Sequence, residues 1–263
     1  MSKQIAGTHE CLFFDQQLFD YGVGDVDKNE KVQENIKGVI VPHHLLASHI
    51  IADTLHEVLK PEIKKVIIIG PDHYEKGSTV ITTSDYVWET PFQKVFPDIE
   101  TINFLAKKDY VNINQKILEN EHSISGLIPF ISHYSPEVQA IPLIISQRIT
   151  KEEIDDISEE LYKLSQDDSV AIIVSVDFSH YLTSSEAEEN DEISFQAIKN
   201  RNYEKLLTFN NDYVDSPQSL VIFLKTLDRL GIYNLEVLHN TNSGRLVGDP
   251  FVENTSYFGI VFW

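Results

Sequence analysis

Three histidines come shortly after runs of apolar, β-branched residues that predict buried strands. The histidines are His43, His73 and His180, and the runs that they follow are 38–42, 65–70 and 170–176. Helical patterns separate these runs, which is typical of parallel strands covered on both faces. Because ligands bind beyond the carboxyl ends of such strands, we expect the three histidines to meet at one edge of a sheet.

The imidazole side chain indicates what chemistry this edge can support. Imidazole is the commonest protein ligand for metals, and it transfers protons near neutral pH. Non-heme iron is often held by two histidines and one carboxylate. Asp72 and Asp177 lie near the same predicted edge, where each could bind a metal or orient a histidine. A fourth histidine, His122, precedes a predicted helix that could pack over this edge.

The order of the predicted elements indicates an α/β fold, with a mainly parallel sheet flanked by helices. The predicted strands are 38–42, 65–70, 79–83, 138–145, 170–176, 233–238 and 255–262, and the predicted helices are 46–59, 98–107, 113–120, 123–133, 150–164, 184–199 and 217–230. Thr150 and Glu153 have the spacing of a capping box. A length of 263 residues favours a single domain over 1–263. Residues 1–36 have the least regular pattern, with a turn expected at 22–25.

The composition restricts the partners that the chain can have. With 21 basic and 41 acidic residues, the formal net charge is −20, which repels phosphate backbones and anionic lipids. No apolar run reaches the roughly 20 residues that cross a bilayer, and the first ten residues contain no signal-peptide core. Cys11 is the one cysteine, so no internal disulfide can form. We therefore expect a cytoplasmic protein that binds neither nucleic acid nor membranes.

An ordered series of short motifs resembles the Memo-like family, which includes the AmmeMemoRadiSam system protein B. The series contains Val41-Pro42-His43, Gly70-Pro71-Asp72-His73, Glu89-Thr90-Pro91-Phe92, Glu121-His122-Ser123-Ile124, Leu127-Ile128-Pro129-Phe130 and Ser175-Val176-Asp177-Phe178-Ser179-His180-Tyr181. Near the end of the chain, Asn242-Ser243-Gly244 and Tyr257-Phe258-Gly259 are similar to its closing segment. Their order and spacing, from about residue 39 onward, make the resemblance specific.

The resemblance implies the fold of the class III extradiol dioxygenases. It implies that His43 and His73 match the two histidine ligands of the dioxygenase iron. His122 and His180 would match the pair that steadies oxygen and handles protons. For Memo-like proteins, the resemblance implies metal binding and redox activity.

The third metal ligand departs from the family pattern. Dioxygenases use a late glutamate at this position, and some Memo proteins use a late cysteine. The stretch that we match to it, 242–246, contains neither. Asp249 is the nearest carboxylate, and His180 could instead complete a site of three histidines.

Three functional hypotheses follow. The first is a metal-dependent enzyme that acts on a small organic substrate, with iron as the metal, or alternatively copper or zinc. In this hypothesis, the metal is bound by His43, His73 and His180, although His180 could instead act as a base. His122 stabilises a developing charge, and Asp177 orients a histidine. The second is a non-catalytic protein that keeps the pocket and binds a partner, such as a radical enzyme. The third is a zinc-type hydrolase, which needs an open coordination position and an activated water; the chain has no Gly-x-Ser-x-Gly nucleophile motif.

Overall fold

In the computed structural model, the described residues are 7–24, 26, 33–249 and 251–263. They form a twelve-stranded sheet with the strand order β1-β5-β6-β8-β3-β9-β2-β12-β10. Beyond this path, β11 pairs with β12, β4 pairs with β8, and β7 pairs with β4. The central strands β8, β3, β9 and β2 are parallel to one another, and β12 runs antiparallel to β2. The predicted α/β class with a parallel central sheet is confirmed. That the chain is a single domain stays a prediction.

The strands have the following bounds: β1 Thr8–Glu10, β2 Gly38–Val41, β3 Lys65–Pro71, β4 Ile81–Thr83, β5 Val87–Glu89, β6 Lys94–Pro97, β7 Val111–Ile113, β8 Gln139–Ile145, β9 Val170–Ser175, β10 Phe178–Leu182, β11 Leu235–Asn242 and β12 Asn254–Phe262. The helices are α1 Gln16–Gly24, α2 Ser48–Val58, α3 Ile99–Leu105, α4 Gln115–Glu119, α5 His122–Ser125, α6 Ile128–Tyr134, α7 Lys151–Ser165, α8 Ser184–Lys199, α9 Tyr203–Leu206, α10 Pro217–Arg229 and α11 Ser243–Val247, with a 3₁₀ turn, η1, at Leu45–Ala47.

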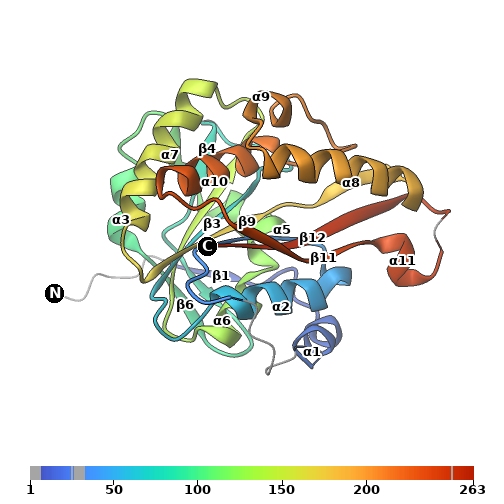
Figure 1. Ribbon diagram of the computed structural model, residues 1–263. Helices are drawn as coiled ribbons and strands as arrows, with labels where there is room; N and C mark the ends of the chain where they lie inside the picture. Colours follow the sequence, from blue (N-terminus) through green and yellow to red (C-terminus); the bar gives the residue numbers. More distant parts are fainter. Residues whose placement is uncertain (1–6, 25, 27–32, 250) are drawn as a thin grey trace.

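Helices cover both faces of the central sheet, as Figure 1 shows with α7, α8 and α10 on one side and α1, α2 and α6 on the other. Side chains alternate along each strand between two apolar cores. Ile67 and Ile69 of β3 pack with α7 and α10, whereas Val66 and Ile68 pack with α2 and α6. Burial on both faces explains why these strands have continuous Val/Ile runs rather than an alternating pattern. No helix formed by the described residues is long and apolar enough to span a bilayer.

Several predicted elements are confirmed, and others differ. The capping box of Thr150 and Glu153 begins α7 as expected. The predicted helix 123–133 is divided into α5 and α6, and Ile113 belongs to β7 rather than to a helix. Residues 178–182, which we did not predict as a strand, form β10 and pair with β12.

The N-terminal segment contains more regular structure than predicted, because β1 and α1 both lie in it. The turn expected at 22–25 is wrong for residues 22–24, which belong to α1, and Asp25 lies outside the described residues. A Cβ atom on Gly22 would lie 2.5 Å from the carbonyl oxygen of Ser48. Gly22 is therefore a point of close approach between α1 and α2 rather than a turn residue.

Asp98 connects the start of α3 to the central sheet. Its carboxylate accepts hydrogen bonds from the backbone N–H and the hydroxyl of Thr101, and it forms an ion pair of 2.6 Å with Lys65 on β3. Burial raises the pKa of Asp98, but the bonds from Lys65 and Thr101 outweigh this effect and hold the pKa below its ordinary value. The carboxylate therefore stabilises the fold when it is charged.

We predict that Asp98→Asn lowers the free energy of unfolding at pH 7 by about 1–2 kcal/mol, because a charge-assisted contact becomes a neutral one while the helix cap remains. A lowered pKa in the folded state gives stability that is present above the unfolded value of 3.8 and lost below it. The difference between wild type and variant in urea unfolding should therefore shrink as the pH falls below 3.8. The exposed Glu100→Gln serves as the control, and a difference that persists at pH 2.5 would contradict the role of the charge.

Candidate metal centre

Three adjacent parallel strands deliver the site residues to one edge of the sheet. β9 lies between β2 and β3, and Val41 of β2 is in register with Ser175 of β9. His43 and Asp177 each lie two residues beyond this pair, so they are neighbours, and the His43 N–H donates to Asp177 Oδ1 at 3.0 Å. His73 lies two residues beyond the end of β3. The predicted meeting of strand ends is confirmed for these residues.

His43, His73 and His122 form the centre of the site. One ring nitrogen from each lies within 4.8 Å of the others. The ring centroids are 5.1 Å apart for His43 and His73, 5.0 Å for His43 and His122, and 4.2 Å for the stacked pair His73 and His122. His43 is buried, whereas the other two side chains are 24% and 33% exposed. The cluster is therefore closed at His43 and accessible on the other side.

The hydrogen bonds of His43 determine which ring nitrogen carries the proton. The Ser175 hydroxyl donates to the carbonyl of Ser123 at 2.6 Å, so its oxygen is left to accept from His43 Nδ1 at 3.2 Å. Burial, together with the neighbouring histidines, holds the pKa of His43 well below its ordinary value, so the ring is neutral. Its Nε2 atom therefore presents a lone pair to the centre of the site.

Two carboxylates face this lone pair. Asp215 Oδ2 lies 3.3 Å from His43 Nε2, and Asp177 Oδ2 lies 3.6 Å from it. Burial and the charge of Asp215 raise the pKa of Asp177 well above its ordinary value, so Asp177 is protonated and can donate. Asp215 Oδ2 accepts from the Asp177 N–H at 3.1 Å, whereas Oδ1 is buried without a hydrogen-bond partner among the described residues. A carboxylate that faces an imidazole lone pair favours a cation between them.

His73 is oriented by Glu121, which is fully buried at the start of α5. Glu121 accepts from the His73 backbone N–H at 3.0 Å and pairs with His73 Nδ1 at 2.8 Å. This contact leaves His73 Nε2 facing Asp215 Oδ2 at 3.7 Å. Burial lowers the pKa of His73, but hydrogen bonds to Asp215 and Glu121 outweigh it and raise the pKa to about 10. A proton therefore occupies His73 when no other cation is bound.

The spacing of these atoms suits a metal ion. Ligand atoms about 2.0–2.2 Å from one ion lie about 3.0–3.5 Å from each other, and Asp215 Oδ2 lies 3.3 and 3.7 Å from the Nε2 atoms of His43 and His73. Two neutral imidazoles and a carboxylate form the donor set of non-heme iron sites. Ser175 and Glu121 supply the outer hydrogen bonds that metal-binding histidines usually have.

The other predicted site residues lie at different distances from this centre. His180 lies on β10, outside the group of three histidines, and its Nδ1 is buried without a partner among the described residues. Asp72 accepts from the N–H of Gly77 rather than from a histidine. Asp249, which we considered as a third ligand, is exposed and accepts from the N–H of Phe251. It follows Gly248, whose left-handed conformation ends α11.

Asp215 and the supporting role of Glu121 were not predicted from the sequence. Asp215 comes directly before Ser216, the N-cap of α10, in a stretch without a strand pattern. Its neighbour Val214 forms a β-bridge with Phe178, and this contact between distant segments brings Asp215 to the strand ends. The position of Asp215 before a predicted helix was the one sequence signal available, and it is common to many structural residues.

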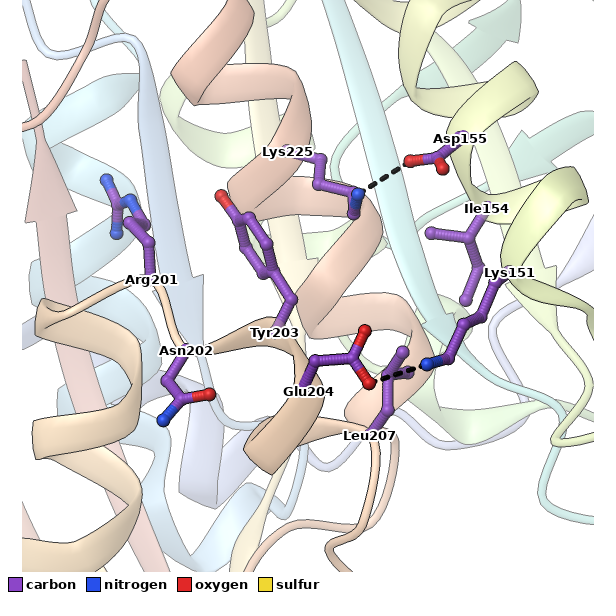
Figure 2. Close-up of a pocket in the computed structure, with 9 residues that line it drawn as sticks. All are labelled: Lys151, Ile154, Asp155, Arg201, Asn202, Tyr203, Glu204, Leu207 and Lys225. Carbon is purple, nitrogen blue, oxygen red and sulfur yellow. Dashed lines mark hydrogen bonds and ion pairs between the residues drawn. The ribbon is translucent and has the colours of Figure 1, made fainter.

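A separate hollow of about 290 Å³ lies between α7, α9 and α10. Figure 2 shows its lining, in which Lys225 pairs with Asp155 and Lys151 pairs with Glu204, both at 2.6 Å. Its charged groups are largely neutralised within the lining, and it contains none of the clustered histidines. The hollow therefore supplies no further part of the histidine site.

The comparison with protein families identifies the chain, because the model of the Memo-like protein family matches residues 17–260. The chain belongs to this family. Two relatives described as MEMO1 family proteins, from Aquifex aeolicus and Nitrosopumilus maritimus, are each 26% identical, with 90% and 87% of this chain and 88% and 84% of theirs covered. A third, from Methanopyrus kandleri, is 28% identical over 92% of this chain and 89% of its own.

The comparison with solved structures supports the fold. The crystal structure of an uncharacterized Escherichia coli K12 protein matches with a TM-score of 0.52 at 11% identity, covering 84% of this chain and 99% of that one. At this identity, the likeness concerns the fold alone. The sheet flanked by helices is the extradiol-dioxygenase-like fold expected for a Memo-like protein.

We predict that Glu121→Gln weakens the binding of added Co²⁺ by about 10- to 100-fold, because His73 loses the charged partner that orients its ring. Isothermal titration calorimetry on the apo protein would measure this change. Glu119→Gln, two residues away and directed at the N–H of Glu10, is the matched control. Equal Co²⁺ affinities for Glu121→Gln and wild type would contradict the supporting role of Glu121.

Proposed function

We propose that this Memo-like protein is a metal-dependent oxidoreductase that acts on a small organic substrate, with its metal ion held by His43, His73 and Asp215. The observation that supports it best is the contact between His43 Nε2 and Asp215 Oδ2, two hydrogen-bond acceptors 3.3 Å apart in a buried site. Repulsion between two acceptors is relieved by a cation that both can bind. The donor set favours iron first, with copper or zinc as alternatives.

Bound iron or copper would supply redox chemistry and polarise a substrate oxygen. The residues of the chain would hold the substrate and manage protons. Burial and the charge of His73 lower the pKa of His122, and burial lowers that of His180, so both rings are neutral near pH 7 and can accept a proton. Asp177, through its contact with the His43 backbone, would keep His43 in place. The partial exposure of His73 and His122 leaves room for a small substrate.

A zinc-type hydrolase is the second candidate, because His43, His73 and His122 lie close enough to bind one ion together. Three histidines with an open fourth position are a catalytic zinc arrangement. The two candidates differ in the role of His122, which is a ligand in the second and a proton-handling residue in the first.

The non-catalytic alternative depends on the lack of a late metal ligand, and Asp215 can fill this position. A partner protein, such as a radical enzyme, stays a prediction.

We predict about one iron or copper ion per chain in protein purified without a tag under anaerobic conditions. The double variant His43→Ala/His73→Ala should contain none, because it lacks two ligands. Inductively coupled plasma mass spectrometry would measure both proteins. The exposed Asp249→Asn is the control for a carboxylate outside the cluster. Wild-type protein that stays metal-free after reconstitution with Fe²⁺, Cu²⁺ and Zn²⁺ would contradict the proposed function.

We predict that Asp215→Asn and His122→Ala separate the two candidates. If Asp215 is a ligand, Asp215→Asn should lower the Fe²⁺ affinity by more than the roughly 10–100-fold typical of outer-shell partners, and His122→Ala should change it less. Competition with a fluorescent chelator would measure these affinities. The reverse order, together with a preference for Zn²⁺, would favour the hydrolase with three histidine ligands.

A further inference from the structure

A hollow of about 610 Å³ lies at the edge of the central sheet opposite the histidine cluster. Its lining comes from the segment before β2, the end of α2, the turn before β3 and the turn before β9. These three strands are parallel, so their starts lie at one edge, whereas His43 and His73 follow strand ends at the other. A hollow of this volume can hold a small molecule. It is therefore separate from the metal centre.

Glu57 contributes a buried carboxylate to this hollow. The residue is 4% exposed, and its Oε2 atom is buried without a hydrogen-bond partner among the described residues. Lys60 Nζ lies 3.8 Å from Oε2, beyond hydrogen-bond distance, and donates instead to the carbonyl of His56 at 2.9 Å. His56 Nδ1 lies 3.5 Å from the other oxygen, Oε1. The Oε2 atom thus lacks a donor, which a ligand could supply.

The position of Glu57 in α2 adds to the cost of this burial. Glu57 is the second-last residue of the helix. The C-terminal end of a helix carries a partial negative charge, so a carboxylate there is unfavourable and a cation is favourable. The helix, the burial and the missing hydrogen bond therefore all disfavour the charge of Glu57. A cation bound in the hollow would offset all three effects.

The other charged groups of the lining also favour a cation. The lining contains four acidic and two basic side chains, which are Glu34, Glu57, Glu62, Asp168, Lys37 and Lys60. Both ammonium groups already donate to backbone carbonyls, that of Lys37 to Asp167 at 2.7 Å. The excess of acidic groups therefore attracts a positively charged ligand.

The chemistry of the lining suits an organic cation better than a metal ion. A metal ion needs several ligand atoms close together. Within the part of the chain that the structure describes, the one group of three side chains arranged to hold an ion is the histidine cluster. Ile36, Val58 and Ile63 supply an apolar part of the hollow. An ammonium group with three N–H donors, carried on an aliphatic chain, matches both parts of the lining.

We propose that this hollow is a second ligand site, which binds a small aliphatic amine. The ammonium group donates to Glu57 Oε2, and the methylene chain packs against Ile36, Val58 and Ile63. The exposed Glu34, Glu62 and Asp168 favour a diamine, because they attract a second ammonium group. This site is independent of the metal centre, so it extends beyond the proposed function.

The experiment uses the full-length protein and 1,5-diaminopentane as the probe. Carbon-13 methyl NMR of Ile36 and Ile63, which line the hollow, reports binding at this place rather than elsewhere. Glu57→Gln should weaken the probe dissociation constant by about 10- to 150-fold, the value of one charge-assisted hydrogen bond. The neutral 1,5-pentanediol, of similar length, should not bind. The exposed Glu137→Gln, outside the hollow, is the matched control and should bind the probe like wild type.

Thermal unfolding without the probe distinguishes a ligand-binding carboxylate from a structural one. Glu57→Gln should unfold at the same temperature as wild type or higher, because it removes a buried charge that the helix end disfavours. A second variant, Lys60→Met, keeps the aliphatic stem and removes a competing cation. It should strengthen probe binding by about two- to fivefold, the value of a partly exposed ion pair. This variant tests the site even if Glu57→Gln fails to fold.

Three results would overturn the proposal. The first is equal affinity of wild type and Glu57→Gln for 1,5-diaminopentane, and the second is equal binding of the diamine and the diol. The third is a lower unfolding temperature of Glu57→Gln together with unchanged or weaker probe binding by Lys60→Met, which would make Glu57 a structural partner of Lys60. None of these results concerns the metal centre, so the proposed function would stand or fall separately.

Discussion

The parallel register of β2, β9 and β3 is the constraint on which the site depends. Val41 pairs with Ser175 across β2 and β9, and Ile69 pairs with Val174 across β3 and β9. These hydrogen-bonded pairs end the three strands at nearly the same level. The loops that follow therefore emerge side by side, and His43, Asp177 and His73 meet without a long connection. The apolar layers on both faces keep this register, because a shift by one residue would turn each Val/Ile row toward the wrong core.

Burial of several carboxyl groups at this edge costs free energy, which a bound cation would offset. Glu121, Asp177 and Asp215 are all nearly inaccessible to solvent. In the absence of metal, protons on His73 and Asp177 provide the compensation, as the directions of their pKa changes indicate. A divalent ion would replace the proton of His73, and both His43 Nε2 and Asp215 Oδ2 would then be attracted to this ion. Metal binding is therefore expected to release protons and to stabilise the fold.

The antiparallel side of the sheet adds a second set of contacts to the same edge. β12 runs against β2, so its first half lies beside the loop that carries His43 and His44. Tyr257 from this strand reaches His44, and β10 on its other side carries His180. A fold of this type hosts different activities through such additions. His180 and Tyr257 therefore come from the antiparallel part of the sheet rather than from the parallel strands.

The sequence by itself determined the elements whose signal is local. Runs of Val and Ile predicted β2, β3, β8 and β9, a capping box predicted the start of α7, and the position of His43 and His73 after two of these runs predicted their meeting. Each signal depends on neighbouring residues and on the two-sided burial of parallel strands. The family was also recognisable, because its motifs are short and ordered along the chain.

Only the tertiary structure decided how the site is completed. Asp215 lies 172 residues from His43 in the chain, and Tyr257 lies 213 residues from His44. Neither has a periodic pattern that assigns it to the site, and both arrive through pairing of distant segments, Val214 with Phe178 and β12 with β2. Whether a carboxylate or a phenol belongs to a site depends on which atoms lie next to it. Those atoms are set by packing between segments, which local sequence does not encode.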